Sequence, residues 1–461
     1  MAVKFYDTET KRKREFVPLD EDCVTMYVCG ITSWSYAHIG NARPAVVFDV
    51  LARLLRERYK QLIYVRNITD IDDKINRAAQ ERGVSITEIS EQFICAYHED
   101  MHALGVLSPD VEPLVTEHVN EIHEFIQQLI DKEHAYVAEG HVLFSVASYD
   151  NYGELSRRDP EELLAGARVD VAPFKRDAGD FVLWKPSTDD QPGWPSPWGR
   201  GRPGWHIECS AMSAAHLGKT IDIHGGGHDL VFPHHENERA QSVCAHGQQF
   251  VRYWMHNGFV NVDKEKMSKS LGNVLLVRDL LEKAPGEAVR YALLAAHYRA
   301  PLDWSDDVLI QAKNSLDRLY GVLRELEAIP AMEGNHVPIS FMDALHDDLN
   351  TPKAMAELFS IAKQANVCED KEELSRLKSA LVHAGQLLGL LQSSPEEWFQ
   401  GSSSNEPQAQ QFAQQVESLI AKRSEAKAAK DWALADAVRD ELTALGVVLE
   451  DGPQGTRWKR S

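Results

Sequence analysis

The sequence has no long apolar run. No stretch of its 461 residues approaches the roughly 18 consecutive apolar residues that a membrane-spanning helix requires. The first residues, MAVKFYDTETKRKREF, also lack the apolar core of a secretory signal. Together these absences predict a cytoplasmic protein. Since 43% of the residues are hydrophobic, the chain can still bury large cores, and its length predicts roughly three domains.

Cysteine is scarce, and positive charge is in the minority. Six cysteines spread over 461 residues do not form the dense pattern of a disulfide framework, so reduced thiols or metal ligands are expected. The 49 lysines and arginines face 70 acidic residues, which gives a formal net charge of −21. Phosphate affinity comes from clustered cations, so this balance argues against indiscriminate polyanion binding. A nucleic-acid partner therefore has to meet local basic patches.

One stretch, residues 203–241, concentrates side chains that bind metals. It holds one cysteine, six histidines and five carboxylates around a glycine triplet. If Pro233 opens a helix, His234 and Glu238 share one face at positions i and i+4. With a thiolate from Cys209 they form a set of S, N and O ligands that suits Zn²⁺ better than Mg²⁺ or Ca²⁺, and a fourth ligand must come from elsewhere. The alternative is that the cysteine is a small buried hydrophobe and the histidines are ordinary core or surface groups, because no paired CxxC motif is present.

The amino-terminal sequence alternates between strand-like and helix-like patterns. Residues 23–29, CVTMYVC, form a short apolar run with β-branched residues, which predicts a buried strand. Residues 42–59 carry apolar residues at helical spacing, and residues 61–66 supply a second strand. Such a strand–helix–strand unit belongs to a parallel sheet, whose ligands gather at the carboxyl ends of the strands. Three polar side chains are expected at that edge: Cys29, His38 and Thr69.

The start of this helix is a candidate phosphate site. After His38, Ile39 and Gly40, unpaired N–H groups and the positive end of the helix dipole can face an anion. The His38 imidazole and the Asn41 amide stand beside them as further donors. The alternative is a simple turn capped by Asn41.

A second candidate for phosphate binding is the loop at residues 264–273, KEKMSKSLGN. Its residues Lys266 and Lys269 lie three positions apart, so they can carry two ammonium groups to one polyphosphate. The alternative is that the loop is simply solvated, as lysine-rich loops usually are.

The rest of the sequence predicts further domains. Residues 71–134 and the sequence beyond residue 310 show helical periodicity, whereas a hairpin turning near Glu139 and Gly140 indicates an insertion. We predict a Rossmann-type α/β domain with a parallel sheet, then an all-α helix bundle, and then a linker at 401–410 that leads into a small α+β domain. The predicted limits are 1–310 for the α/β domain, with an insertion at about 116–200, then 311–400 and 401–461.

Two motifs that lie far apart in the sequence resemble the signature of a known family. HIG at 38–40 together with KMSKS at 266–270 resembles the paired signature of class I aminoacyl-tRNA synthetases. Within that class the chain resembles the cysteinyl-tRNA synthetase family along its whole length. Four segments carry this closer likeness: MYVCGIT at 26–32, RNITDIDDKI at 66–75, GRPGWHIECSAM at 201–212 and FPHHENE at 232–238.

The resemblance implies roles for individual residues. It implies that zinc is held by four side chains: Cys29, Cys209, His234 and Glu238. It implies that cysteine is bound beside Thr69 and Trp205, and that ATP, accompanied by Mg²⁺, contacts His38, Gly40 and Lys269. Four residues are implied to act in catalysis: His38, Asn41, Lys266 and Lys269. At Asn41 the sequence departs from the family signature, which more often has a second histidine. An amide still donates to phosphate but carries no charge.

The reaction implied by the resemblance activates L-cysteine with ATP and then passes the cysteinyl group to tRNA(Cys). One alternative is a ligase that passes cysteine to a small amine, and another is a non-catalytic, zinc-bearing RNA-binding protein. The long helical region after residue 310 argues against the first, and the presence of both nucleotide motifs argues against the second. We expect a monomer without a membrane partner.

In that family the carboxyl-terminal region meets the anticodon. Seven basic residues form the candidate patch: Lys422, Arg423, Lys427, Lys430, Arg457, Lys459 and Arg460. The alternative is a solvated helix face with ion pairs between neighbouring turns. Unpaired bases of an RNA loop can stack on aromatic rings, for which Trp432 and Trp458 are the candidates.

Overall fold

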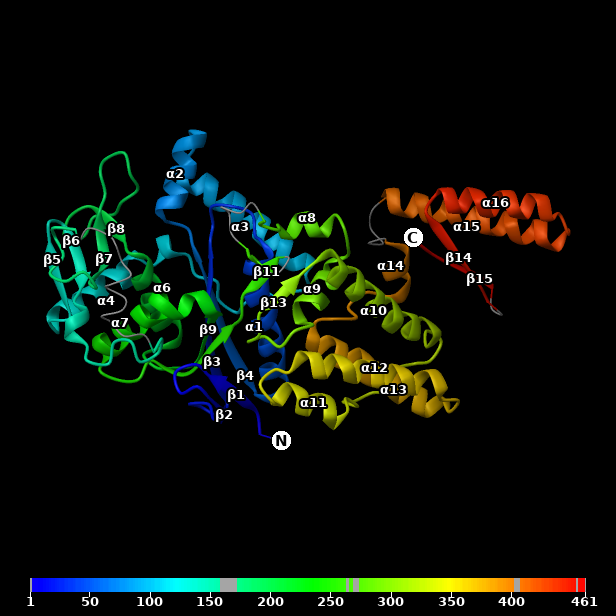
Figure 1. The fold of residues 1–461 in the computed structure, drawn as a ribbon, viewed down its shortest axis with the longest axis horizontal. Helices are drawn as coiled ribbons and strands as arrows, with labels where there is room; N and C mark the ends of the chain where they lie inside the picture. Colours follow the sequence, from blue (N-terminus) through cyan, green and yellow to red (C-terminus); the bar gives the residue numbers. More distant parts are fainter. Residues whose placement is uncertain are drawn as a thin grey trace. The chain divides into compact units, whose positions relative to one another are not determined.

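The computed structural model describes residues 2–157, 172–262, 265–267, 273–401, 407–452 and 455–460. The chain divides into two compact units, whose elements are labelled in Figure 1. The first unit consists of Met1–Ala312, Pro338–Glu357 and Leu387–Leu390, and the second of Lys313–Val337, Leu358–Gln386 and Leu391–Ser461. None of the helices in the described residues combines the length and apolar character of a membrane-spanning segment.

The first unit is built on a four-stranded parallel sheet. Its strands lie in the order β10 (Val251–Asn257), β9 (Ile221–Gly227), β3 (Cys23–Thr32) and β4 (Gln61–Thr69). Each pair of neighbours runs parallel. The strands are largely buried, as expected for a parallel sheet with both faces covered. The predicted parallel α/β fold is therefore confirmed.

The first strand of this sheet runs further than the sequence predicts. β3 continues beyond Cys29 to Thr32, with a break in its register against β4 between Val28 and Ile31. At Gly30 the two strands approach so closely that a Cβ atom would overlap the carbonyl oxygen of Asn67, so only glycine fits. Cys29 therefore lies at an irregularity within the strand, and the prediction that it ends the strand is wrong.

Helices cover the sheet on both faces. α1 (Ile39–Arg58) packs against the strands, and α9 (Gly286–Leu294) packs against α1. On the other face α6 (Trp205–Leu217) and α7 (Glu236–His246) share one apolar core with residues of β3, β4 and β10 (Figure 1). α1 begins at Ile39, three residues earlier than predicted, because His38 caps it.

The sequence between β4 and α6 forms helices and then an antiparallel sheet. The helices are α2 (Asp73–Arg82), α3 (Ile86–Ala103) and α4 (Val119–Asp131). Gly83 ends α2 in a left-handed conformation, which glycine adopts without strain. The sheet contains β5 (Ala135–Ala138), β6 (His141–Phe144), β7 (Phe181–Pro186) and β8 (Gly201–Pro203) in that order. Its first turn lies at Glu139 and Gly140, where the sequence places it.

Smaller strands border the parallel sheet. β1 (Lys4–Asp7) and β2 (Arg12–Glu15) form a hairpin, which is joined to β10 by the Thr8 N–H group donating to the Trp254 carbonyl at 2.9 Å. β11 (Val260–Val262) pairs with β12 (Glu265–Lys266) and β13 (Leu302–Trp304). The short helix α8 (Val277–Leu281) follows β12.

The chain after β13 is mainly helical. Its first helices are α10 (Asp306–Glu325), α11 (Ile339–His346), α12 (Thr351–Val367) and α13 (Lys371–Leu388). They are followed by α14 (Pro395–Gln400), α15 (Pro407–Ala428) and α16 (Trp432–Ala444), and by the hairpin of β14 (Val447–Gly452) and β15 (Gly455–Arg460). α15 already begins at Pro407, so the predicted linker at 401–410 is too long, and residues 402–406 lie outside the described part.

A buried ion pair ties α1 to α9 within the first unit. Asp49 on α1 accepts hydrogen bonds from Arg53 Nε at 2.8 Å and from the Leu107 N–H group at 2.9 Å. Arg290 on α9 donates to the same carboxylate and also, at 2.7 Å, to the Leu388 carbonyl. Burial by itself raises the pKa of Asp49, but the two guanidinium groups outweigh it and hold the pKa below its ordinary value.

We predict that Asp49→Asn lowers the free energy of unfolding of the first unit by about 3 to 5 kcal/mol, because it leaves a buried guanidinium uncompensated. Urea denaturation followed by circular dichroism measures this loss. The control is Asp347→Asn, which breaks the exposed pair with Lys13 and should cost about 1 kcal/mol or less. Since the native pKa of Asp49 is depressed, its contribution is complete above the unfolded pKa of about 4 and is lost as the pH falls through the lower native pKa. Equal losses in the two variants would contradict this assignment.

Candidate functional site

Four side chains from separate elements meet at the carboxyl edge of the parallel sheet. Cys29 comes from β3, Cys209 from α6, His234 from the turn Val231–His235, and Glu238 from α7. One ligand atom of each lies within 4.8 Å of all the others. The last three side chains are buried and Cys29 is half-buried. The structure thus brings together all four residues implied as zinc ligands.

The geometry and charge of this cluster fit a metal ion. The two sulfur atoms of Cys29 and Cys209 are 3.7 Å apart, and two thiolates on one tetrahedral zinc lie about 3.8 Å apart. A hydrogen bond with Cys29 lowers the pKa of Cys209 to about 6, which favours the thiolate that metals require. Burial raises the pKa of Glu238, but His224 and His234 outweigh it and hold that pKa well below its ordinary value.

The helix that carries Glu238 does not begin at Pro233. Residues Val231–His235 form an irregular turn in which Phe232 is extended, and the regular helix starts at Glu236. The prediction of a helix opening at Pro233 is therefore wrong. The spacing still works, because His234 and Glu238 remain one turn apart, with Nε2 of the former 3.0 Å from Oε1 of the latter.

Four further histidines surround the cluster, and the sequence did not single them out. His224 Nε2 lies 2.9 Å from Glu238 Oε2, and His206 Nδ1 lies 2.9 Å from His234 Nδ1. His235 Nδ1 lies 2.7 Å from His256 Nε2. Such contacts fix the orientation of metal ligands. In a second set of four, one ligand atom of each residue also lies within 4.8 Å of the others. This set is Cys29, His224, His235 and Glu238.

Thr69 and Trp205 lie beside the cluster in different ways. Thr69 is buried, and its hydroxyl donates to Glu208 Oε2 at 3.1 Å. Glu208 precedes Cys209 on α6, and burial raises its pKa well above the ordinary value. Trp205 is 43% exposed and stacks on the ring of His234 at 4.4 Å. The sequence offered no signal for Glu208, because its contact with Thr69 joins residues far apart in the chain.

The start of α1 is held by a reciprocal pair of hydrogen bonds. The Asn41 N–H group donates to His38 Nδ1, and the His38 N–H group donates to Asn41 Oδ1, both at 3.2 Å. The cap residue is therefore His38, and the Asn41 side chain completes the capping box by accepting from the His38 N–H group. Both side chains are therefore fixed at the opening of the helix.

A cavity of about 330 Å³ opens in front of this helix end. His38, Gly40 and Asn41 line one side, and Asp229, Asn257, Phe259 and Met267 line others. A Cβ atom on Gly40 would lie only 2.9 Å from the Met267 methyl group, so the loop at 264–273 touches the helix start. Lys266 lies in β12, where only its backbone is described, and Lys269 lies outside the described residues.

A smaller cavity joins the helix start to the metal cluster. It measures about 130 Å³, and Cys29 and Gly30 line it together with Gly40, Asn41 and Asp229. Its size suits a small amino acid. It shares Gly40, Asn41 and Asp229 with the larger cavity, so a ligand in one lies directly beside a ligand in the other.

The carboxyl-terminal basic residues are largely neutralised by acidic partners. Arg423 and Lys427 both pair with Asp451 at 2.9 Å. Two further pairs join Arg457 to Glu325 and Lys459 to Glu450, both at 2.8 Å. Trp458 is 2% exposed and belongs to the core of this region, so it is not available for stacking on RNA, whereas Trp432 is 61% exposed.

Three family models match successive parts of the chain. Residues 15–314 match the tRNA synthetases class I (C) catalytic domain. Residues 340–392 match the DALR domain, and residues 409–458 match the cysteinyl-tRNA ligase anticodon binding domain.

Curated relatives and solved structures agree with these matches. The chain is 59% identical to a cysteine–tRNA ligase of Parvibaculum lavamentivorans, over 100% of this chain and 98% of the relative. It is also 59% identical to one of Xanthomonas campestris pv. campestris, over 100% of both chains. In fold it is similar to Mycobacterium tuberculosis methionyl-tRNA synthetase in complex with methionyl-adenylate, with a TM-score of 0.59, 16% identity, and coverage of 83% of this chain and 95% of that one. The chain therefore belongs to the cysteine–tRNA ligase family of class I tRNA synthetases.

Proposed function

We propose that the chain activates L-cysteine with ATP in the two adjoining cavities and then transfers the cysteinyl group to tRNA(Cys). The observation that carries this proposal is the cavity of about 130 Å³ between Cys29 and the start of α1. An amino acid held there would present its carboxylate toward Gly40 and Asn41, which also border the cavity of about 330 Å³. The carboxylate would attack the α-phosphate of ATP bound in the larger cavity, and pyrophosphate would leave.

Zinc is the metal that the cluster fits best. Two thiolates, one imidazole and one carboxylate, from Cys29, Cys209, His234 and Glu238, form a set typical of Zn²⁺ and atypical of Mg²⁺. This set has one more thiol than the alternative group with His224 and His235. We assign His224 a supporting role, because its ring holds Glu238 in place at 2.9 Å.

The metal gives the site its preference for cysteine. A pocket that relies on shape alone typically separates such similar side chains by only about 10- to 200-fold. When bound, zinc would favour a substrate thiolate over the hydroxyl of serine, since sulfur is the better ligand. Trp205, stacked on His234 and partly exposed, and Thr69, held by Glu208, are proposed to line the approach of the substrate.

We propose that residues on two sides of ATP stabilise its negative charge. His38 and Asn41 present ring and amide donors at the helix start, with Gly40 allowing the close approach of phosphate. Lys266 and Lys269 are proposed to supply positive charge from the opposite loop, with Mg²⁺ accompanying ATP. Asn41 also fixes His38 through the reciprocal hydrogen bonds, which a histidine at this position would make differently.

The regions after the catalytic domain are proposed to bind tRNA(Cys). We assign the catalytic domain to residues 1–310, including the loop at 264–273 and an insertion at about 116–200. The helix bundle is assigned to 311–400 and the anticodon-binding domain to 401–461. The match of residues 409–458 to the cysteinyl-tRNA ligase anticodon binding domain supports tRNA over a small amine as the acceptor. The exposed Trp432 is the proposed stacking residue.

We predict that the purified protein carries one zinc ion per chain and that Cys209→Ala removes it. Because the ion acts on the substrate thiol, the variant should lose at least about 100-fold in kcat/KM for cysteine-dependent ATP–pyrophosphate exchange. Metal analysis by mass spectrometry gives a readout that does not depend on activity. The control is Cys244→Ala, a buried cysteine of α7 that belongs to neither metal group and should keep its zinc. Full zinc content in Cys209→Ala, or an undiminished preference for cysteine over serine in folded zinc-free protein, would refute this role.

We predict that Lys269→Ala slows cysteinyl-adenylate formation about 100-fold while the affinity for cysteine stays within about twofold, because the ammonium acts on phosphate charge that develops in the transition state. Rapid-quench measurement of adenylate formation separates the two quantities. Lys283→Ala is the control, since this exposed lysine pairs with Asp306 and should leave both unchanged. An adenylate-formation rate like that of the unmodified chain would rule out this function for Lys269.

We predict that Trp432→Ala weakens binding of tRNA(Cys) by about 5- to 150-fold, the equivalent of about 1 to 3 kcal/mol for one base stacked on an aromatic ring. Trp432→Phe should restore most of the affinity, since it keeps a ring for stacking. Filter binding measures both, and ATP–pyrophosphate exchange should be equal in all three proteins. If Trp432→Ala binds tRNA(Cys) as tightly as the parent, the ring does not meet RNA.

A further inference from the structure

A buried arginine behind the proposed nucleotide cavity holds four backbone carbonyl groups. Arg43 lies early in α1, and its side chain has no exposed surface. Its guanidinium donates to the carbonyls of Gly258 and Phe259, both at 2.8 Å, and to those of His297 at 3.3 Å and Ala300 at 2.7 Å. These carbonyls belong to two backbone segments, one that follows β10 and one that follows α9.

The charge of Arg43 is balanced without an acidic partner. A buried charge is normally paired with an opposite charge, because its transfer out of water is costly. None of the carboxylates in the described residues forms an ion pair with Arg43, and burial lowers its pKa to about 10, so it is still charged at neutral pH. The four carbonyl dipoles supply the compensation instead. Their oxygen atoms would repel one another without the cation, so the guanidinium holds the two segments together.

The two segments also approach each other closely. A Cβ atom on Gly258 would overlap the carbonyl group of Ala300, so only glycine fits at this position. The Gly258 N–H group donates to the Tyr298 carbonyl at 2.8 Å. The two segments therefore form one backbone unit, and Arg43 fixes this unit to α1.

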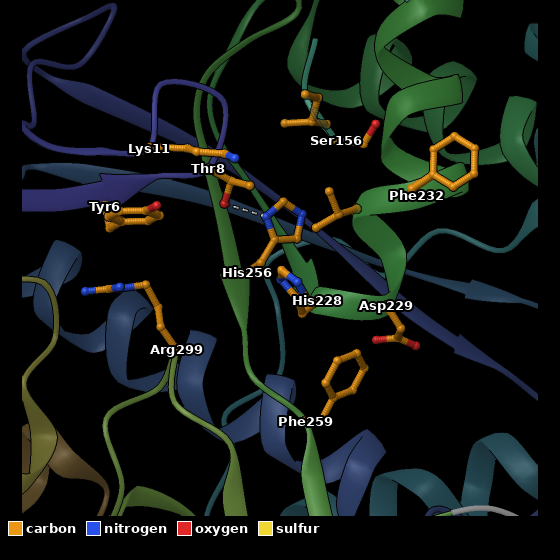
Figure 2. Close-up of a pocket in the computed structure, with 12 residues that line it drawn as sticks. Tyr6, Thr8, Lys11, Ser156, His228, Asp229, Phe232, His256, Phe259 and Arg299 are labelled. Carbon is orange, nitrogen blue, oxygen red and sulfur yellow. Dashed lines mark hydrogen bonds between the residues drawn. The ribbon is translucent and has the colours of Figure 1, made fainter. Parts of the chain in front are cut away.

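The segment after β10 forms one wall of the proposed nucleotide cavity. Gly258, Phe259 and Val260 line the cavity of about 330 Å³, and the first turn of α1 lines another side of it. The Phe259 ring also borders a neighbouring cavity of about 740 Å³ beside the β1–β2 hairpin, where it meets His228 edge-on at 5.7 Å (Figure 2). Since Arg43 belongs to α1 and holds the other wall, it sets the distance between the two.

The two walls suit different parts of a nucleotide. The start of α1 offers the ring and amide donors that are proposed to meet phosphate. The other wall is mainly apolar, with Phe259 and Val260 beside Met267 and Val274. Such a surface suits the flat face of a base, because every base can stack on a ring. A nucleotide that spans the cavity would therefore place its base against the wall that Arg43 holds.

We propose that Arg43 is a positioning residue that holds the wall for the adenine base at the correct distance from the phosphate-binding start of α1. The inference rests on the proposed function, because it concerns ATP in this cavity. Arg43 is buried behind the wall, so it acts through the carbonyls of Gly258 and Phe259 and not on the nucleotide itself. A shift of this wall would move the α-phosphate away from the attacking carboxylate.

The test compares Arg43→Lys with Arg290→Lys in the full chain. Arg290 is the matched control, because its guanidinium is equally buried and donates to the carbonyls of Leu388 and Gly105, away from the nucleotide cavity. Lysine keeps the charge in both variants, but one ammonium group lacks the planar fork that reaches several carbonyls at once. Thermal unfolding followed by circular dichroism checks that both variants fold, and both should lose stability.

For Arg43→Lys we expect the KM for ATP and the inhibition constant of adenosine each to rise about 10-fold, the loss typical of one charge-assisted hydrogen bond. Adenosine carries the base without phosphate, so it reports on this wall alone. The affinities for pyrophosphate, measured as a product inhibitor, and for cysteine should stay within about twofold, because neither ligand has a base. Arg290→Lys should leave all four constants unchanged.

Gly258→Ala tests the same wall without removing the guanidinium. Its methyl group would push the segment after β10 away from Ala300, so the affinity for adenosine should again fall while that for pyrophosphate stays. This variant decides the question if Arg43→Lys does not fold.

The inference is overturned if folded Arg43→Lys or Gly258→Ala binds ATP and adenosine as tightly as the parent. It is also overturned if adenosine, pyrophosphate and cysteine all weaken alike, or if Arg290→Lys loses as much affinity for adenosine, because general loosening would then explain the loss. Absence of cysteine-dependent ATP–pyrophosphate exchange in the parent chain would instead refute the proposed function. Adenosine binding can still be measured by calorimetry in that case, so the two failures are distinguishable.

Discussion

The burial of one carboxylate shapes the centre of this molecule. Glu238 has no exposed side-chain surface, so its charge has to be balanced by immediate neighbours. His224 and His234 lie within 3.0 Å of it, and the Cys29 sulfur lies at 3.4 Å. These neighbours come from β9, from the turn before α7 and from β3, so the carboxylate holds separate elements together. The same side chains also bring together the sulfur, nitrogen and oxygen atoms that a divalent cation requires as ligands.

The parallel sheet explains why three cavities converge. Its strands all end at one edge, and the connections that follow them carry the polar side chains. Asp229 follows β9, and it borders the small cavity next to Cys29, the cavity in front of α1 and the large cavity beside the β1–β2 hairpin. An amino acid and a nucleotide in the first two of these cavities would therefore lie beside one residue, which is the proximity that activation needs.

The chain is acidic overall, and several of its carboxyl-terminal basic residues are paired with acidic side chains. At the carboxyl terminus Arg423 and Lys427 are committed to Asp451, so these basic residues stabilise the small domain and are not free for phosphate. The proposed recognition of tRNA would then depend on few cations and on exposed rings such as Trp432. Such proposed stacking accords with a net charge of −21, because stacking on bases does not require an excess of positive charge.

The sequence by itself determined the fold class, the family and the main candidate residues. Apolar runs and glycine turns identified the strand–helix–strand unit, and the motifs at 38–40 and 266–270 together identified the class, since local patterns depend on neighbours in the chain. The positions of Lys266 and Lys269 relative to phosphate stay predictions. Only the tertiary structure decided that Trp458 is buried, that β3 breaks at Cys29, and that Glu208, His224 and Asp229 belong to the site. These depend on contacts between residues far apart in the chain, which periodicity and spacing do not encode.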